Sequence, residues 1–80
     1  MNLYLISQEV NCGYDTYDSA VVCAESEEAA RTTHPSGSEW DGTFGRYSSW
    51  SALADVKVKV IGIADATIPC GVVCASYNAG

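Results

Sequence analysis

The stretch VKVKVIGI, residues 56–63, decides the fold. Valine alternates with lysine over its first five residues, a period that predicts a β-strand with one buried and one wet face. The exposed lysines also suit a strand at the edge of a sheet. We therefore expect a sheet to form the body of this domain.

Three further segments predict the rest of that sheet. Residues 2–8 have partly apolar side chains on both faces, which favours a central strand. The turn residues 11–16 connect them to a second strand over residues 17–24. Residues 71–77 are mostly apolar, so we expect this last strand in the interior of the sheet.

One short helix is predicted between the second and third strands. Ser26 is a good N-cap because its hydroxyl can accept a hydrogen bond from a free amide of the first turn. Glu27 and Glu28 follow, where a negative charge meets the positive end of the helix dipole. Pro35 disfavours helix at His34, so the helix should end there.

A long loop rich in glycine, serine and aromatic residues is predicted over residues 35–49, followed by a helical turn over residues 49–54. The fold class is therefore α+β. We expect one domain, residues 1–80, with a four-stranded, mostly antiparallel sheet and one short helix in the order ββαββ.

The charge of the chain is acidic and uneven. Ten acidic residues stand against four basic ones, a formal charge of −6. Residues 1–34 hold six carboxylates against one cation, and residues 35–80 hold four against three. This balance disfavours direct binding to nucleic acid or to an anionic membrane, and it suits a partner with a basic surface. The alternative is that the charge serves solubility alone.

The sequence predicts neither a secretory signal nor a membrane span. Residues 1–9 lack a basic start, and no segment reaches the roughly 20 apolar residues that a span requires. We therefore expect a cytoplasmic location. The four cysteines are then expected as free thiols, and the sequence does not select among their three disulfide pairings.

The sequence contains no motif that predicts a catalytic or metal-binding site. A cysteine nucleophile would need a base, and His34 is the single histidine. Cys70 and Cys74 form a C-x3-C pair without the second close pair of a zinc site. Asp15 and Asp18 are more typical of turn caps than of an acid–base pair. We expect no enzyme activity, no cofactor and no metal.

Two sets of residues are candidates for binding a partner. The first is an acidic array that could copy part of the charge spacing of nucleic acid, or could be a solvated face: Asp15, Asp18, Glu25, Glu27, Glu28, Glu39 and Asp41. The second is aromatic, and could be a recognition surface or could fold back onto a thin core: Trp40, Phe44, Tyr47 and Trp50.

The motifs of the chain resemble a family of short acidic phage and prophage proteins. Residues 11–19, NCGYDTYDS, fit the pattern N-x-G-Y-D-T-Y-D-S, and an acidic helix and the pair His34-Pro35 follow. Residues 74–80, CASYNAG, fit the end of the pattern. The resemblance covers most of the chain and leaves about residues 37–50 variable. Small phage proteins of this type include anti-CRISPR proteins, so the resemblance implies a location in the host bacterial cell.

The leading hypothesis is a phage-encoded anti-CRISPR or anti-defence inhibitor. Its acidic surface would mimic nucleic acid and block a basic DNA-binding site on a subunit of a CRISPR surveillance complex. The alternative hypothesis is a structural or housekeeping phage protein that binds its partner through the aromatic loop of residues 40–50.

Overall fold

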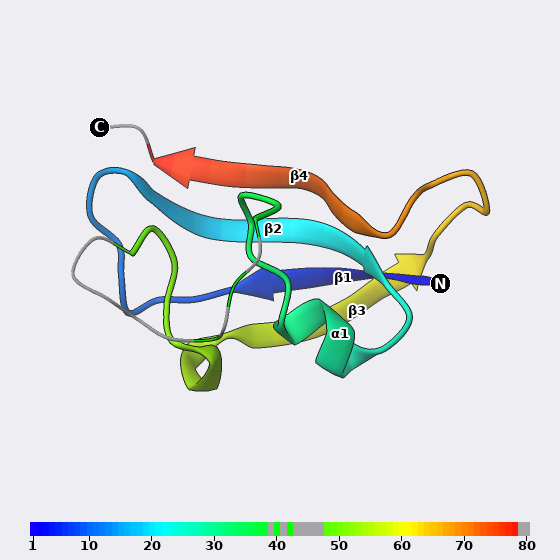
Figure 1. The fold of residues 1–80 in the computed structure, drawn as a ribbon, viewed down its shortest axis with the longest axis horizontal. Coiled ribbons are helices and arrows are strands. Elements are labelled where there is room, and N and C mark those ends of the chain that lie inside the picture. Colours follow the sequence, from blue (N-terminus) through cyan, green and yellow to red (C-terminus); the bar gives the residue numbers. More distant parts are fainter. Residues whose placement is uncertain (39, 41, 43–47, 79–80) are drawn as a thin grey trace.

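The computed structural model describes residues 1–38, 40, 42 and 48–78. The described elements are, in chain order, β1 (Asn2–Ser7), β2 (Thr16–Ala24), α1 (Glu27–Arg31), the 3-10 turn η1 (Leu53–Asp55), β3 (Lys57–Ile63) and β4 (Gly71–Asn78). The four strands form one antiparallel sheet, and α1 is a single short helix (Figure 1). The α+β class expected from the sequence is confirmed.

The strands lie in the order β3-β1-β2-β4. β1 is therefore central, and Leu5 is paired with Val21 on one side and with Lys59 on the other. β3 lies at an edge, as its lysines suggested. The expected interior place of β4 is wrong, because β4 pairs with β2 alone and forms the second edge. Apolar composition cannot distinguish a central strand from an edge strand whose side chains are small.

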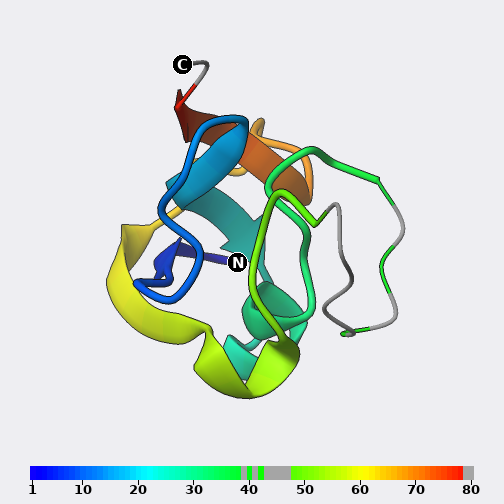
Figure 2. The same ribbon diagram turned by 90° about the vertical axis from the view of Figure 1, so that its left-hand side faces the viewer.

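The core lies on one face of the sheet. Tyr4, Ile6 and Val22 are buried there, together with Ala30 of α1 and Trp50 of the connection to β3. Figure 2 shows α1 and residues 32–38 on the same side of the sheet. Because side chains alternate along a strand, Leu3, Leu5 and Val21 point to the opposite side, where they stay partly exposed.

The helix ends earlier than the sequence predicted. It stops at Arg31, and the hydroxyls of Thr32 and Thr33 donate to carbonyl oxygens of the last turn, including that of Ala29. These side chains satisfy carbonyls that a longer helix would have paired with amides. In the described part of the chain, no helix has both the length and the apolar character needed to cross a bilayer.

Candidate binding surfaces

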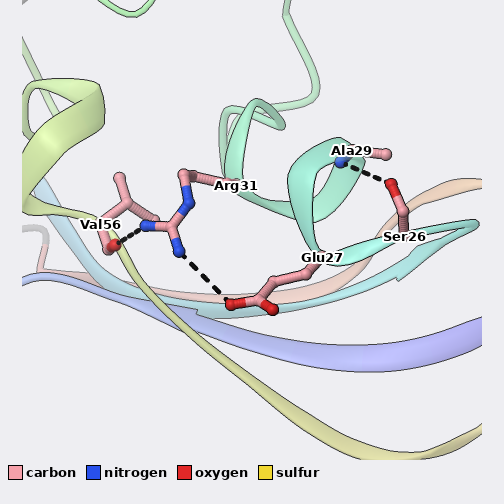
Figure 3. A network of polar contacts seen from close by, with 5 residues as sticks. All are labelled: Ser26, Glu27, Ala29, Arg31 and Val56. Carbon is pink, nitrogen blue, oxygen red and sulfur yellow. Dashed lines mark hydrogen bonds and ion pairs between the residues drawn. The ribbon is translucent and has the colours of Figure 1, made fainter.

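The start of α1 presents three exposed carboxylates. Ser26 follows β2 and still has an extended backbone. Its Oγ accepts a hydrogen bond of 3.1 Å from the amide of Ala29 (Figure 3). The predicted N-cap is thereby confirmed. Glu25, Glu27 and Glu28 flank this cap, and all three are exposed to solvent. The cap fixes their backbone positions, and their side chains reach into the solvent.

Arg31 neutralises one of these three carboxylates. Its Nη2 lies 3.4 Å from Oε1 of Glu27, and its Nη1 donates to the carbonyl oxygen of Val56 (Figure 3). The guanidinium thus ties α1 to the residue that precedes β3. Glu25 and Glu28 form no ion pair with any described residue. They carry the uncompensated charge at this end of the sheet.

The acidic array is divided by the length of β2. Asp15 and Asp18 lie at the start of that strand, and Glu25 follows its end. At about 3.3 Å per residue, Asp18 is roughly 23 Å and Asp15 roughly 33 Å from Glu25 along the strand. Glu39 and Asp41 lie outside the described residues. The array predicted from the sequence is therefore at least two separate groups of carboxylates.

Asp15 is held by contacts with the end of β4. Its backbone has a φ of 60°, its amide donates to the carbonyl of Asn78 at 2.6 Å, and the hydroxyl of Tyr77 donates to its carboxylate at 3.3 Å. Desolvation raises the pKa of the Tyr77 hydroxyl, and the charge of Asp15 raises that pKa further. This carboxylate has a fixed backbone at an exposed corner of the sheet.

The four aromatic candidates do not form one surface. Trp50 is only 1% exposed and belongs to the core, so its side chain is not available to a partner. A thin core needs large side chains, which is the alternative that the sequence had left open. Trp40 is half-buried and packs against the edge of that core. Phe44 and Tyr47 lie outside the described residues.

Trp40 instead joins aromatic rings that the sequence did not group with it. Its ring lies 5.8 Å from that of His34, and His34 lies 6.1 Å from Tyr17. Tyr17 in turn lies 4.7 Å from Tyr77. These four residues, here called the aromatic row, come from β2, β4 and the connection after α1. They are far apart in the chain, so no local pattern could have revealed the row.

Ser36 fixes the orientation of His34. The amide of Ser36 donates to Nδ1 of His34 at 3.1 Å, and its Oγ lies 2.8 Å from the same nitrogen. Because Nδ1 accepts an amide proton, the neutral ring carries its own proton on Nε2. Partial burial lowers the pKa of His34, so the ring is mainly neutral near pH 7.

A groove of about 1200 Å³ opens beside His34 and Trp40. Residues 32–34, 36–38 and 40 line one side of it, and residues 70–72 at the start of β4 line the other. Figure 1 shows this connection rising across β2 towards β4. The groove is open to solvent, and many of its lining side chains carry hydroxyls.

Residues of the segments 11–19 and 74–80 form hydrogen bonds that join distant parts of the chain. Nδ2 of Asn11 donates to the carbonyls of Ser48 at 2.8 Å and Trp50 at 2.9 Å. Oγ1 of Thr16 and Nδ2 of Asn78 both donate to the carbonyl of Gly13. The two segments therefore meet at one end of the sheet. Their hydrogen bonds fix the backbone at Trp50 and the end of β4.

Gln8 is a structural residue that the sequence analysis did not single out. Its buried Nε2 donates to the carbonyls of Asn11 and Tyr17, both at 2.8 Å. Its Oε1 accepts hydrogen bonds from the amides of Val10 and Asn11. One side chain thus pairs with four backbone groups, three in the β1–β2 loop and one in β2. The sequence did contain a signal for this role: Gln8 is a polar residue at a position where the alternation along β1 predicts a buried side chain.

Comparison of the chain with protein-family models, with curated proteins and with solved structures finds no match.

The cysteines are free in the structure. Cys12, Cys70 and Cys74 are exposed, and Cys23 is buried with its thiol 3.9 Å from the carbonyl oxygen of Ile68. Among the described residues no three His, Cys, Asp or Glu side chains gather where they could hold a metal ion.

Proposed function

We propose that this protein is a phage-encoded anti-defence inhibitor of the anti-CRISPR type that acts by binding. Its carboxylates would occupy a basic, DNA-binding site on a CRISPR effector complex in the cytoplasm of the host bacterium. The CRISPR target rests on the family resemblance. The mode of action rests on one observation of the structure, the exposure of the acidic side chains.

The eight carboxylates that the structure describes are all exposed: Glu9, Asp15, Asp18, Glu25, Glu27, Glu28, Asp55 and Asp65. Only Glu9 and Glu27 form ion pairs with described cations, Lys57 and Arg31 respectively. Exposed carboxylates without cations leave a negative potential over the surface, which attracts a basic partner and speeds its association.

The spacing of the two carboxylate groups supports a long basic groove as the target. They are separated by roughly 23 to 33 Å along β2. A DNA duplex rises about 3.4 Å per base pair, so this span corresponds to roughly seven to ten base pairs. The sheet provides a stiff frame between the groups.

The proposal is tested by reversing charges without disturbing the fold. Glu25→Lys with Glu28→Lys leaves the contacts of Arg31 with Glu27 and Val56 in place. The control, Glu9→Lys with Asp55→Lys, makes the same change in net charge at exposed positions outside the proposed array. It also removes the exposed ion pair of Glu9 with Lys57, which contributes little to stability. Each variant is immobilised and used to capture effector complexes from a lysate with active CRISPR systems, at two salt concentrations.

We expect the wild type to capture an effector complex, and to capture less of it at the higher salt concentration. The variant at Glu25 and Glu28 should bind about tenfold more weakly or worse, while the control loses much less. Equal losses in the two variants would show that only the overall charge matters. Salt-independent capture would contradict the electrostatic mode.

The alternative remains a structural or housekeeping phage protein that binds through aromatic side chains. The half-exposed position of Trp40 beside the groove favours it, whereas Trp50 is in the core. Trp40→Ala should then abolish capture of a virion component and the charge variants should spare it. The reverse pattern favours the inhibitor.

A further inference from the structure

The two edges of the sheet differ in their chemistry. β3 forms one edge and carries the exposed side chains of Lys57 and Lys59, and such charges discourage the addition of a further strand. β4 forms the other edge, and it contains neither a charged residue nor a proline. Residues 73–77 of β4 are all exposed. The length and composition of this edge strand therefore favour pairing with another strand.

The backbone of Tyr77 points away from the sheet. Tyr77 lies opposite Tyr17 of β2, and both backbone groups of Tyr17 have other partners. The amide of Tyr17 donates to the carbonyl of Ser49 at 2.8 Å, and its carbonyl accepts a hydrogen bond from Nε2 of Gln8. Tyr17 and Tyr77 are therefore an antiparallel pair without mutual hydrogen bonds, and the amide and carbonyl of Tyr77 face outward.

Ala75 presents its backbone in the same way. The carbonyl of Asn78 faces β2, because it accepts a hydrogen bond from the amide of Asp15. Inward and outward groups alternate along a strand, and residues 74–78 pair with β2 without an extra residue on β4. Ala75 and Tyr77 are therefore the two residues of this segment whose amide and carbonyl point to the outer side of β4.

These two residues suit pairing with a second copy of β4. In an antiparallel pair with a two-fold axis at Ser76, Ala75 of each copy lies opposite Tyr77 of the other, and their outward groups can exchange hydrogen bonds. Ala75 and Tyr77 lie on the same face of the strand. The ring of Tyr77, which is 46% exposed, then covers the small side chain of Ala75 across the axis.

Charge does not oppose this arrangement. Asp15 lies at the end of β4, beside Asn78, which is two residues from the axis. The two copies of this corner are thus separated by roughly 13 Å along the strands. That distance exceeds the Debye length of about 8 Å at physiological ionic strength. The lysine-bearing β3 strands form both edges of the joined sheet, so the assembly ends at two copies.

We propose that the protein forms a two-fold symmetric dimer in which β4 pairs antiparallel with β4 of a second copy about Ser76. The joined sheet carries the carboxylate groups of both copies on one continuous frame. This pairing goes beyond the proposed inhibition and does not depend on Glu25 or Glu28. Because the paired segment is short, we expect the dimer to dissociate on dilution into the low micromolar range.

The first test is sedimentation equilibrium of the intact protein from about 1 to about 500 µM. The wild type should change from monomer to dimer over this range. Ser76→Lys places like charges opposite each other at the axis, and it should raise the dissociation constant about fivefold or more. The matched control is Ile61→Lys, which makes the same charge change at an exposed residue of β3. A monomer at all concentrations, or equal effects of the two variants, would overturn the proposal.

The second test fixes the register with a disulfide and does not rely on a disruptive charge. Cys12→Ser, Cys70→Ser and Cys74→Ser remove the exposed thiols, and the remaining native cysteine is buried. Ser76→Cys in this background places two thiols across the axis, where Cα atoms about 4.5 Å apart are within the reach of a disulfide. Glutathione disulfide should then produce a covalent dimer, and Ile61→Cys in the same background should produce little. Equal yields would contradict the pairing.

A third measurement follows the outward amides themselves. Hydrogen exchange at Ala75 and Tyr77 should slow several-fold when the wild type is concentrated from monomer to dimer, because these amides gain partners. Exchange along β3 should slow less. If the amides of Ala75 and Tyr77 exchange equally fast at both concentrations, the interface does not involve the outer side of β4 and the proposal is wrong.

Discussion

Trp50 is the side chain on which the core depends most. It is the largest of the fully buried side chains described, and it packs with strand residues such as Ile6 and Val22. We expect Trp50→Ala to reduce the free energy of unfolding by about 3–5 kcal/mol, a large part of the stability of a domain of this size. Urea denaturation of the wild type and the variant measures this loss of stability.

Trp40→Ala is the matched control for that change. Trp40 is only partly buried, so its replacement should cost clearly less stability than the replacement of Trp50. Equal losses from the two variants would contradict the division of the tryptophans into a core residue and a surface residue.

His34 should make the stability depend on pH. Partial burial lowers its folded-state pKa below the ordinary value of about 6.5. As pH falls through 6.5, the unfolded chain takes up the proton first, so stability decreases until pH passes the folded-state pKa. A protonated Nδ1 can no longer accept the hydrogen bond from the amide of Ser36, so protonation also breaks this contact.

The measurement is the urea midpoint between pH 7.5 and pH 5, with His34→Gln as the control. In the His34→Gln protein the urea midpoint should change less with pH, and the remaining change should come from the carboxylates. An identical slope in both proteins would contradict the assignment of the slope to His34.

At the scale of elements, the β1–β2 loop is organised from within the sheet by Gln8. We expect Gln8→Met, which keeps the length of the side chain, to cost on the order of 3 kcal/mol, because backbone groups of the loop lose their partners. Denaturation measures the loss, and hydrogen exchange should quicken at the amides of Val10 and Asn11. Unchanged exchange there would contradict this role.

The elements were predicted well where local chemistry decides them. The alternation of valine and lysine indicated β3, and Ser26 indicated the start of α1. The place of β4 was not predictable in this way, because the edge is decided by which strands pair. The end of α1 was missed because the hydroxyls of Thr32 and Thr33 compete for its last carbonyls.

The candidate sites depend on the whole molecule, and so they were less predictable. The acidic residues close in sequence to each other proved to be separated by β2. The aromatic row joins Tyr17, His34, Trp40 and Tyr77 only because β2 pairs with β4 and the connection after α1 folds over both. Sequence spacing identifies the residue types, but the sheet pairing decides which of them meet.

The charge of the whole molecule leads to the central claim, that the protein competes with nucleic acid for a basic site. Competition for DNA binding by a purified CRISPR surveillance complex tests it most directly. The account predicts that the wild type displaces DNA from the complex, and that Glu25→Lys with Glu28→Lys needs about tenfold more protein to do so. Full DNA binding in the presence of saturating wild-type protein would contradict the account.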